Sequence, residues 1–277
     1  MAVVARRFVR KMRGGAQAHL LEADDGRFWV VKFRNNPQHR RILVNEMVAS
    51  VLLQHLQIAC PETTLVRVTE DFLRQNPETY IQLGTRHEPV ALGWHFGSLY
   101  PGDPARIAVY DYLPDALLGQ VANLSEFLGI LVFDKWTANA DSRQSVFLRA
   151  RLRQWVPGGA AHPLKVGFAA LMIDNGYAFD GPHWQFTDSP LQGLYFRPLV
   201  YQGVRSWAAF QPWLDQVIHF PEEVLDDALK RITPEWVEGD EDAVEALLAR
   251  LVARRGETPR LIEDCRRGRV DPFPNWT

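Results

Sequence analysis

A change of sequence pattern near residue 103 is the strongest constraint on how this chain folds. Up to that point, short segments rich in β-branched and aromatic residues surround a single helical pattern, whereas beyond it apolar residues recur mainly at helical spacing. The turn-forming run Pro101-Gly102-Asp103-Pro104 separates the two parts. We therefore predict a bilobal α+β fold. An N-terminal lobe of antiparallel sheet plus one main helix is expected over residues 1–103, and a mostly helical C-terminal lobe over residues 104–277.

The individual elements follow from the spacing of the apolar residues. In the first lobe we expect a helix over residues 39–57 and strands at residues 3–9, 17–23, 28–33, 63–69 and 91–99. In the second lobe we expect paired strands at residues 145–155 and 164–173, and helices at residues 106–118, 123–138, 205–220, 222–231 and 240–255. Pro157-Gly158-Gly159 lies between the paired strands, and its composition indicates a flexible connection.

Composition argues against several classes of protein. The net charge of −2 differs from the strongly basic character of a nucleic-acid binder, so no nucleic-acid partner is expected. No apolar run approaches the roughly 18 residues that cross a bilayer, so no membrane partner is expected. Cys60 and Cys265 are the only cysteines, which fits a reducing, cytoplasmic setting. The first 21 residues are basic and contain no acid, as in a transit peptide, but their apolar spacing favours a first strand.

A lysine and a glutamate occupy complementary positions in the first lobe. Lys32 stands among apolar residues on a predicted buried strand, where an ammonium group is costly without an anionic partner. Glu46 lies on the next predicted helix and is the candidate partner. Such a pair directs a lysine toward the α- and β-phosphates of a nucleotide. The alternative is a surface lysine at a strand end and a solvated helical glutamate.

A small-residue turn between the first two predicted strands is a candidate phosphate loop. Gly14-Gly15-Ala16-Gln17 allows backbone N–H groups to approach phosphate oxygens, so Gly14, Gly15 and Gln17 are candidate nucleotide contacts. No Gly-Lys-Ser/Thr follows, and the spacing differs from the usual kinase glycine pattern. A plain β-turn explains the segment equally well.

A polar run after the predicted helix 123–138 contains a candidate catalytic carboxylate. Asp141 could accept the proton of an attacking hydroxyl or orient that hydroxyl, and Asn139 and Arg143 flank it as orienting or charge-offsetting groups. Asp134 lies two helical turns earlier on the same face. It is either a supporting acid or a helix-surface residue.

A further aspartate ends the last predicted strand. Asp174 is followed by Asn175-Gly176, and an aspartate beside a turn is well placed to bind Mg²⁺ together with phosphate oxygens. The alternative is an ordinary Asp-Asn-Gly turn. No His-Glu-x-x-His and no Gly-x-Ser-x-Gly occurs, so neither a zinc enzyme nor a serine hydrolase is indicated.

In this order along the chain, the segments resemble the HipA-like kinases, a bacterial branch of the protein-kinase-like fold. The resemblance covers about residues 10–180. Its motifs are Gly14-Gly15-Ala16-Gln17, Val31-Lys32-Phe33, Asn45-Glu46, Phe133-Asp134-Lys135-Trp136 with Asn139-Ala140-Asp141, and Ile173-Asp174-Asn175-Gly176. It implies that the protein binds ATP and Mg²⁺, with Lys32 on the phosphates, Asp141 as the catalytic aspartate and Asp174 on the metal. Members with known activity phosphorylate proteins on Ser or Thr, so the implied acceptor is a protein hydroxyl, with a small molecule as the alternative.

One position departs from the kinase pattern. Such catalytic loops place a metal-binding Asn five residues after the aspartate, where this chain has Val146. The amide oxygen of Gln144, two residues earlier, is a candidate replacement. The change at Val146 is consistent with a single-metal kinase, with an altered reaction such as nucleotidyl transfer, or with a pseudokinase. Three hypotheses are kept for the whole chain: an active Ser/Thr kinase, a nucleotide-binding pseudokinase that serves as a regulatory or interaction module, and a structural α+β protein that binds no nucleotide.

Overall fold

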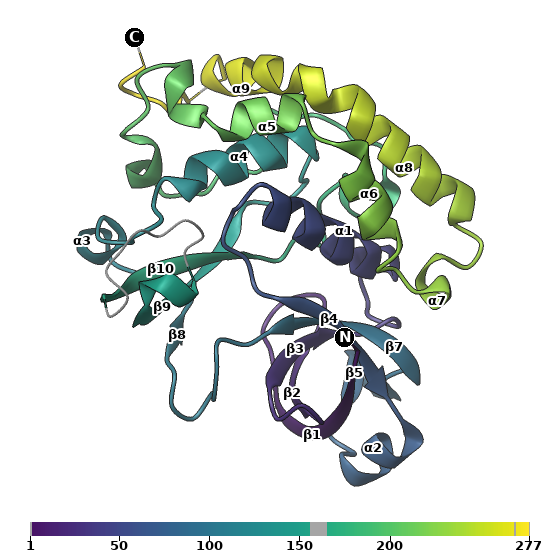
Figure 1. Cartoon of the computed structure of the whole chain (residues 1–277). Helices are drawn as coiled ribbons and strands as arrows, with labels where there is room; N and C mark the ends of the chain where they lie inside the picture. Colours follow the sequence, from purple (N-terminus) through teal and green to yellow (C-terminus); the bar gives the residue numbers. More distant parts are fainter. Residues whose placement is uncertain (1, 156–164, 269, 277) are drawn as a thin grey trace.

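The N-terminal part is built on a closed β-barrel. The computed structural model describes residues 2–155, 165–268 and 270–276 (Figure 1). Around the barrel the strands follow the order β1 (Val3–Lys11), β2 (His19–Ala23), β3 (Phe28–Lys32), β7 (Gly93–Leu99) and β4 (Thr63–Val68). All neighbouring pairs are antiparallel except β1 and β4, which pair in parallel and close the barrel. The basic N-terminal segment is therefore a strand of this barrel.

The interior of the barrel is apolar because alternate side chains of each strand point inward. Trp29 and Val31 of β3 pack there with Leu21 of β2 and Val66 of β4, and all four are fully buried. Between β4 and β7 the chain adds α2 (Glu70–Gln75) and the hairpin of β5 (Tyr80–Leu83) and β6 (Arg86–Pro89), none of which the sequence pattern predicted.

Helix α1 (Arg41–His55) lies between the barrel and the C-terminal helices (Figure 1). Every residue from Ile42 to Leu53 is buried, so the helix has no solvated face. Its apolar side chains belong to the same core as those of the C-terminal helices, and it contacts α6 (Glu222–Leu229) and α7 (Pro234–Val237). The predicted main helix of the first lobe thus shares its core with the second lobe.

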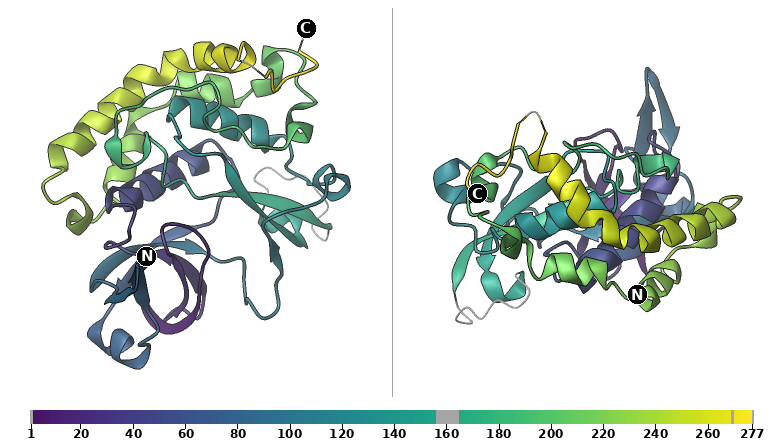
Figure 2. Two further views of the ribbon diagram at one scale, coloured as in Figure 1. Left: turned by 180° about the vertical axis from the view of Figure 1, so that it is seen from behind. Right: turned by 90° about the horizontal axis from the view of Figure 1, so that it is seen from above.

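The C-terminal part combines a small sheet with layered helices. The antiparallel sheet has the order β10 (Val166–Ile173), β9 (Gln144–Arg151) and β8 (Val109–Tyr110). Helix α4 (Glu126–Trp136) is buried along its whole length. It is covered by α5 (Trp213–Ile218), α8 (Glu241–Arg254) and α9 (Thr258–Arg266), as the view from above shows (Figure 2). No helix of the described chain is long and apolar enough to cross a membrane.

Two predicted helices are wrong. Residues 106–118 form β8 and the short α3 (Asp115–Leu118) instead of one helix. Val109 and Tyr110 pair with β9. Pro114 has no backbone N–H to donate to a preceding helical turn, so a helix can begin only after it. Residues 205–220 divide into a 3-10 turn, Trp207–Phe210, and α5, with Pro212 between them. Helix α9 was not predicted, and Pro157-Gly158-Gly159 lies outside the described residues. The lobe boundary at residue 103 stays a prediction.

Candidate active site

A cleft of about 760 Å³ lies between the barrel and the β8–β9–β10 sheet. Residues predicted to be functional line it from both sides: Gly14, Gly15, Lys32, Glu46, Asp141, Gln144 and Asp174. Its apolar wall includes Val30 and Phe96 from the barrel and Val146 and Leu171 from the sheet. Segments more than a hundred residues apart in sequence therefore meet in one cleft.

Lys32 is the meeting point of three elements. Its position follows from the alternation of β3, in which Trp29 and Val31 fill the barrel while Lys32 faces the cleft. Its Nζ contacts Glu46 Oε1 on α1 and lies 2.6 Å from Asp174 Oδ1, just beyond β10. Burial alone would lower the pKa of Lys32, but the two carboxylates outweigh burial and raise it, so the ammonium stays charged. The surface alternative for this lysine and glutamate is therefore wrong.

Asp174 is held on the opposite wall in a strained conformation. Its φ of 59° lies in the left-handed region, which non-glycine residues seldom occupy. Chiefly the charge of Lys32 lowers the pKa of Asp174, against the effect of burial, and a hydrogen bond from the Gln144 side chain lowers it further. The carboxylate is thus ionised and 36% exposed toward the cleft. The turn is more than a chain reversal, since it delivers this carboxylate to Lys32.

The turn after Asp174 fits tightly against α1. A Cβ on Gly176 would lie 2.6 Å from Cγ2 of Ile42, so only glycine fits there. Asn45 fastens the same turn, because its Nδ2 donates to the carbonyl oxygens of Gly176 (2.7 Å) and Ala178 (3.0 Å). Its Oδ1 accepts a hydrogen bond from Trp184 Nε1 at 2.7 Å. Helix α1 therefore places both Glu46 and the Asp174 turn.

A fully buried ion pair lies beneath the cleft. The guanidinium of Arg143 donates to both carboxylate oxygens of Asp134, with Nε 2.9 Å from Oδ2, and both side chains are 0% exposed. Asn139 Nδ2 donates to Asp134 Oδ1 at 2.9 Å. Arg143 Nη1 also donates to the Ile173 carbonyl (3.0 Å) and to Asn175 Oδ1 (2.9 Å). The pair thus joins the loop of Asp141 to the loop of Asp174, and the surface alternative for Asp134 is wrong.

Asp141 lies above this pair and is exposed in the cleft. Its backbone N–H donates to Asn139 Oδ1 at 3.2 Å, and its carbonyl accepts from the Gly193 N–H at 3.2 Å. Its Oδ1 accepts from the Ser142 N–H at 2.7 Å. The backbone on both sides of Asp141 is therefore fixed, while its carboxylate faces the cleft.

Comparisons with known proteins identify the family and the fold of this chain. A family model described as HipA-like kinase matches residues 5–147, which is more than half of the chain. This chain belongs to the HipA-like kinase family. No curated protein sequence matches. The predicted resemblance to this family is thereby confirmed, although Asp174 lies beyond the matched residues.

Solved structures with the same fold are distant in sequence. The structure of hydra Fam20 with sugar aligns with a TM-score of 0.55 and 13% identity, over 95% of this chain and 86% of that chain. The Golgi casein kinase aligns with a TM-score of 0.52 and 12% identity, over 96% of this chain and 74% of that chain. The predicted bilobal, kinase-like α+β fold is confirmed by these similarities.

Three predicted site residues of this HipA-like chain do not line the cleft. Asn139 and Arg143 are buried beneath it and hold the two loops. Gln17 uses its side-chain amide to pair with the backbone of Gln82, with Nε2 donating to the carbonyl at 2.8 Å and Oε1 accepting from the N–H at 2.7 Å. Its amide thus fastens the β5–β6 hairpin to the turn that holds Gly14 and Gly15.

The residues at the cleft fit a magnesium ion that arrives with a nucleotide. Mg²⁺ in such sites takes one or two carboxylates and completes its shell with phosphate oxygens and water. Asp174 offers an ionised carboxylate, and Gln144, whose side-chain amide hydrogen-bonds to it, lines the same cleft. No cluster of three or more His, Cys, Asp or Glu side chains able to hold a metal occurs within the described part of the chain. Phosphate oxygens would therefore have to complete the shell.

Two structural roles escaped the sequence analysis. Asn45 was noticed only as part of a motif, although its side chain fixes the turn after Asp174. The partnership of Asp134 with Arg143 was also missed. A sequence signal for it exists: Asp134 stands in the run Phe127–Trp136, which is apolar on every helical face, so its carboxylate has to be buried and paired.

Proposed function

We propose that this HipA-like kinase transfers the γ-phosphoryl group of ATP, with Mg²⁺, to a Ser or Thr hydroxyl of a protein. One observation carries the proposal: Lys32 joins Glu46 and Asp174 at a cleft into which Asp141 also projects. An ammonium group with an open cleft in front of it attracts phosphate oxygens. The carboxylate of Asp141 lies in the same cleft for the acceptor.

The chain's own residues have separate tasks in this proposal. Lys32 binds the phosphates, and the turn of Gly14 and Gly15 at the cleft edge offers backbone N–H groups to phosphate oxygens. Asp174 and Gln144 would hold Mg²⁺, which when bound neutralises charge on the phosphate oxygens. The protein contributes mainly position and electrostatic stabilisation.

Asp141 acts on the acceptor. Its carboxylate accepts the proton of the Ser or Thr hydroxyl as the oxygen attacks the γ-phosphorus and the bond to the β–γ bridging oxygen breaks, which yields a phosphoester and ADP. The fixed backbone around Asp141 favours this role because the carboxylate needs little reorganisation.

A second candidate function is that of a nucleotide-binding pseudokinase. Val146 favours it, because this residue lines the cleft at the position where kinases of this fold use a metal-binding amide. An isopropyl group cannot ligate a metal. The two functions differ in whether phosphoryl transfer follows nucleotide binding.

Thermal unfolding with ATP and Mg²⁺ tests the shared part of both functions. At about 100 times its Kd, the nucleotide should stabilise the wild type by roughly 2.7 kcal/mol. Asp174→Ala should lose the Mg²⁺-dependent part, whereas Asp111→Ala, which removes another carboxylate of the cleft, should keep it. Absence of any shift in the wild type would contradict both functions.

Asp141→Asn then separates kinase from pseudokinase. In a kinase, this variant keeps the nucleotide-induced shift but loses phosphoryl transfer by at least about a hundredfold. If the wild type itself binds ATP and transfers nothing to any protein of a matched cell extract, the pseudokinase function is the better account.

A further inference from the structure

A segment beyond the residues that the family model matches supports the Asp141 loop from outside. The Gly193 N–H donates to the Asp141 carbonyl at 3.2 Å, and the Arg143 N–H donates to the Leu194 carbonyl at 3.4 Å. We call residues 187–194 the support segment. Because these bonds join backbone to backbone, the position of the support segment determines where the backbone of Asp141 lies.

The support segment lies directly against α4. Gly193 has a φ of 70°, in the left-handed region that favours glycine. A Cβ on Gly193 would clash with the Cβ of Asp134, so the backbone of the segment packs on the helix without a side chain between them. A displaced segment would therefore lose its hydrogen bond to Asp141 or move the loop with it.

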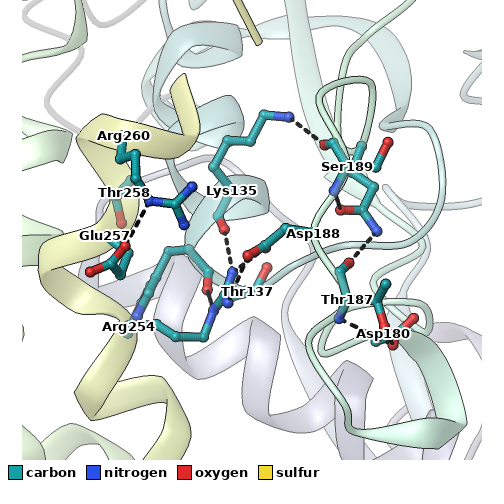
Figure 3. Close-up of polar contacts among 12 residues, drawn as sticks. Lys135, Thr137, Asp180, Thr187, Asp188, Ser189, Arg254, Glu257, Thr258 and Arg260 are labelled. Carbon is teal, nitrogen blue, oxygen red and sulfur yellow. Dashed lines mark hydrogen bonds and ion pairs between the residues drawn. The ribbon is translucent and has the colours of Figure 1, made fainter. Parts of the chain in front are cut away.

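Arg254 of α8 anchors the start of the support segment (Figure 3). Its guanidinium makes two hydrogen bonds to the Asp188 carboxylate, with Nη2 2.6 Å from Oδ1 and Nη1 3.2 Å from Oδ2. The same group donates to the carbonyl oxygens of Trp136 (3.1 Å) and Lys135 (3.3 Å) at the end of α4. One side chain thus joins α8, the end of α4 and the support segment.

A second anchor comes from α4 itself. Figure 3 shows Lys135 directed at Ser189, and its Nζ donates to the carbonyl oxygens of Ser189 (3.2 Å) and Pro190 (2.9 Å). This anchor holds backbone atoms, whereas the anchor from Arg254 depends on the charge of one side chain, Asp188. A substitution at Asp188 therefore removes the ion pair and leaves the second anchor in place.

Hydrogen bonds within the support segment connect its anchored start to Gly193. Gln192 Oε1 accepts from the Ser189 N–H at 2.7 Å, and Gln192 Nε2 donates to the Thr187 carbonyl at 2.8 Å. The Gln192 N–H donates to the Ser189 carbonyl at 3.2 Å. Asp188 therefore belongs to a closed turn whose last residue directly precedes Gly193.

We propose that Arg254 and Asp188 are positioning residues for phosphoryl transfer, because their ion pair holds the support segment and thereby the backbone of Asp141. This inference rests on the proposed function and adds to it a requirement for α8. A carboxylate assists transfer only if it lies within hydrogen-bonding reach of the acceptor hydroxyl, and a displacement of about 1 Å can lower the rate by about a hundredfold. The groups around Lys32 are held by α1 and by the Asp174 turn, so nucleotide binding does not depend on this ion pair.

Steady-state kinetics of the full-length protein test the inference. The acceptor is the best-labelled peptide of a Ser-centred library, with ATP and Mg²⁺, and kcat is expressed per nucleotide-binding site counted by titration with ATP. Arg254→Gln and Asp188→Asn should each lower kcat by about tenfold or more, with KM for ATP within about twofold of the wild type. Counting sites removes unfolded protein from the comparison, so a merely structural role would leave kcat per site unchanged.

Hydrogen exchange adds a measurement that requires no transfer. In both variants the amides of residues 139–144 and 190–194 should exchange at least about tenfold faster than in the wild type, while those of α1 keep their rates. Arg260→Gln is the matched control, because it removes an arginine that pairs with Glu257 and Asp264 of the C-terminal helices. It should match the wild type in kcat, in KM and in exchange.

Several outcomes would overturn the inference. They are an unchanged kcat per site in both variants, a rise in KM for ATP that accounts for the lost activity, and unchanged exchange beside Asp141. If Arg254→Gln fails to fold, Asp188→Asn decides alone, since its side chain is 35% exposed. Transfer by the wild type with unaltered variants would refute only the role of the ion pair. A wild type that gives the ATP·Mg²⁺ thermal shift without any transfer would refute the kinase function as well.

Discussion

Two buried charged clusters flank the segment that contains Asp174, and they differ in how completely they are satisfied. In the lower cluster, Asp134 and Arg143 are 0% exposed, and their polar atoms bond to each other, to Asn139 and to the Asp174 loop. In the upper cluster, Lys32 has contacts with Glu46 and Asp174, and Asp174 remains 36% exposed. A lysine ammonium has three donors, so Lys32 keeps one for a ligand.

The difference separates scaffold from site. A closed cluster gains nothing from a ligand, but it keeps two loops at a fixed distance, so its loss should appear as lost stability. An open cluster keeps charged groups that a ligand can pair with, so substitutions in it should weaken ligand binding. Substitutions in each cluster can test whether this division holds.

The largest effect is expected from Asp134→Ala. Removing the carboxylate leaves Arg143 buried without its charged partner, which should lower the free energy of unfolding by about 3–5 kcal/mol. Urea unfolding followed by circular dichroism measures it. The double variant Asp134→Leu/Arg143→Met should recover part of the loss, because it buries no unpaired charge. A single variant within about 1 kcal/mol of the wild type would contradict the scaffold role.

A mixed effect is expected from Lys32→Met in the open cluster. Stabilisation by ATP and Mg²⁺ should disappear, and the free energy of unfolding should fall by about 1–3 kcal/mol, because Glu46 is 4% exposed and loses its partner. Adding Glu46→Gln should restore stability but not the nucleotide-induced shift. Recovery of both properties in the double variant would mean that Lys32 is a structural residue only.

Glu126 is a third case beside the two clusters, because its carboxyl group is buried and its hydrogen-bond donors are uncharged. It accepts from the Ala59 N–H at 2.7 Å and from Asn123 Nδ2 at 3.0 Å, and burial raises its pKa to about 7. Its folded-state pKa exceeds the unfolded value of about 4.5, so the native state binds more protons between these two pH values. The stability that protonated Glu126 contributes is therefore fully present below its pKa in the unfolded state, about 4.5. It is lost as the pH rises through its pKa in the folded state, about 7.

Glu126→Gln should remove this decline. Relative to the wild type, the variant should gain roughly 1–2 kcal/mol in free energy of unfolding between pH 5 and pH 8. Urea unfolding at several pH values measures the difference, and Glu223→Gln, at an exposed position of α6, is the matched control. Parallel pH profiles for wild type and Glu126→Gln would show that Glu126 is ionised throughout this range.

The smallest effect on stability is expected at the metal side of the open cluster. Gln144→Ala should change the free energy of unfolding by no more than about 0.5 kcal/mol, because Gln144 is exposed. It should nevertheless raise the Mg²⁺ concentration needed for the nucleotide-induced shift severalfold. Val146→Asn restores an amide at the usual kinase position, and it should compensate if placed in a Gln144→Ala background. An unchanged Mg²⁺ requirement in Gln144→Ala would remove Gln144 from the metal site.

Local pattern predicted the positions of the key side chains but not the way they are supported. Strand alternation placed Lys32 opposite the core residues, and the end of an apolar strand placed Asp174 beside a turn; both depend on neighbours in sequence. The contacts of Gln17 with Gln82 and of Asp134 with Arg143 depend on how loops and helices pack. Closure of the barrel through the parallel pair of β1 and β4 is likewise a long-range event that no local period encodes.

The shared core of α1 has a consequence for how this protein could be switched on and off. Glu46 is borne by a helix whose apolar side chains interlock with the C-terminal helices, and Asn45 binds that helix to the Asp174 turn. Helix α1 therefore cannot swing away alone and disconnect Glu46 from an otherwise intact site. An inhibitor, a modification or a binding partner would have to move the barrel, which carries Lys32, relative to α1. Such a movement would separate Lys32 from Glu46 and Asp174 at the same time.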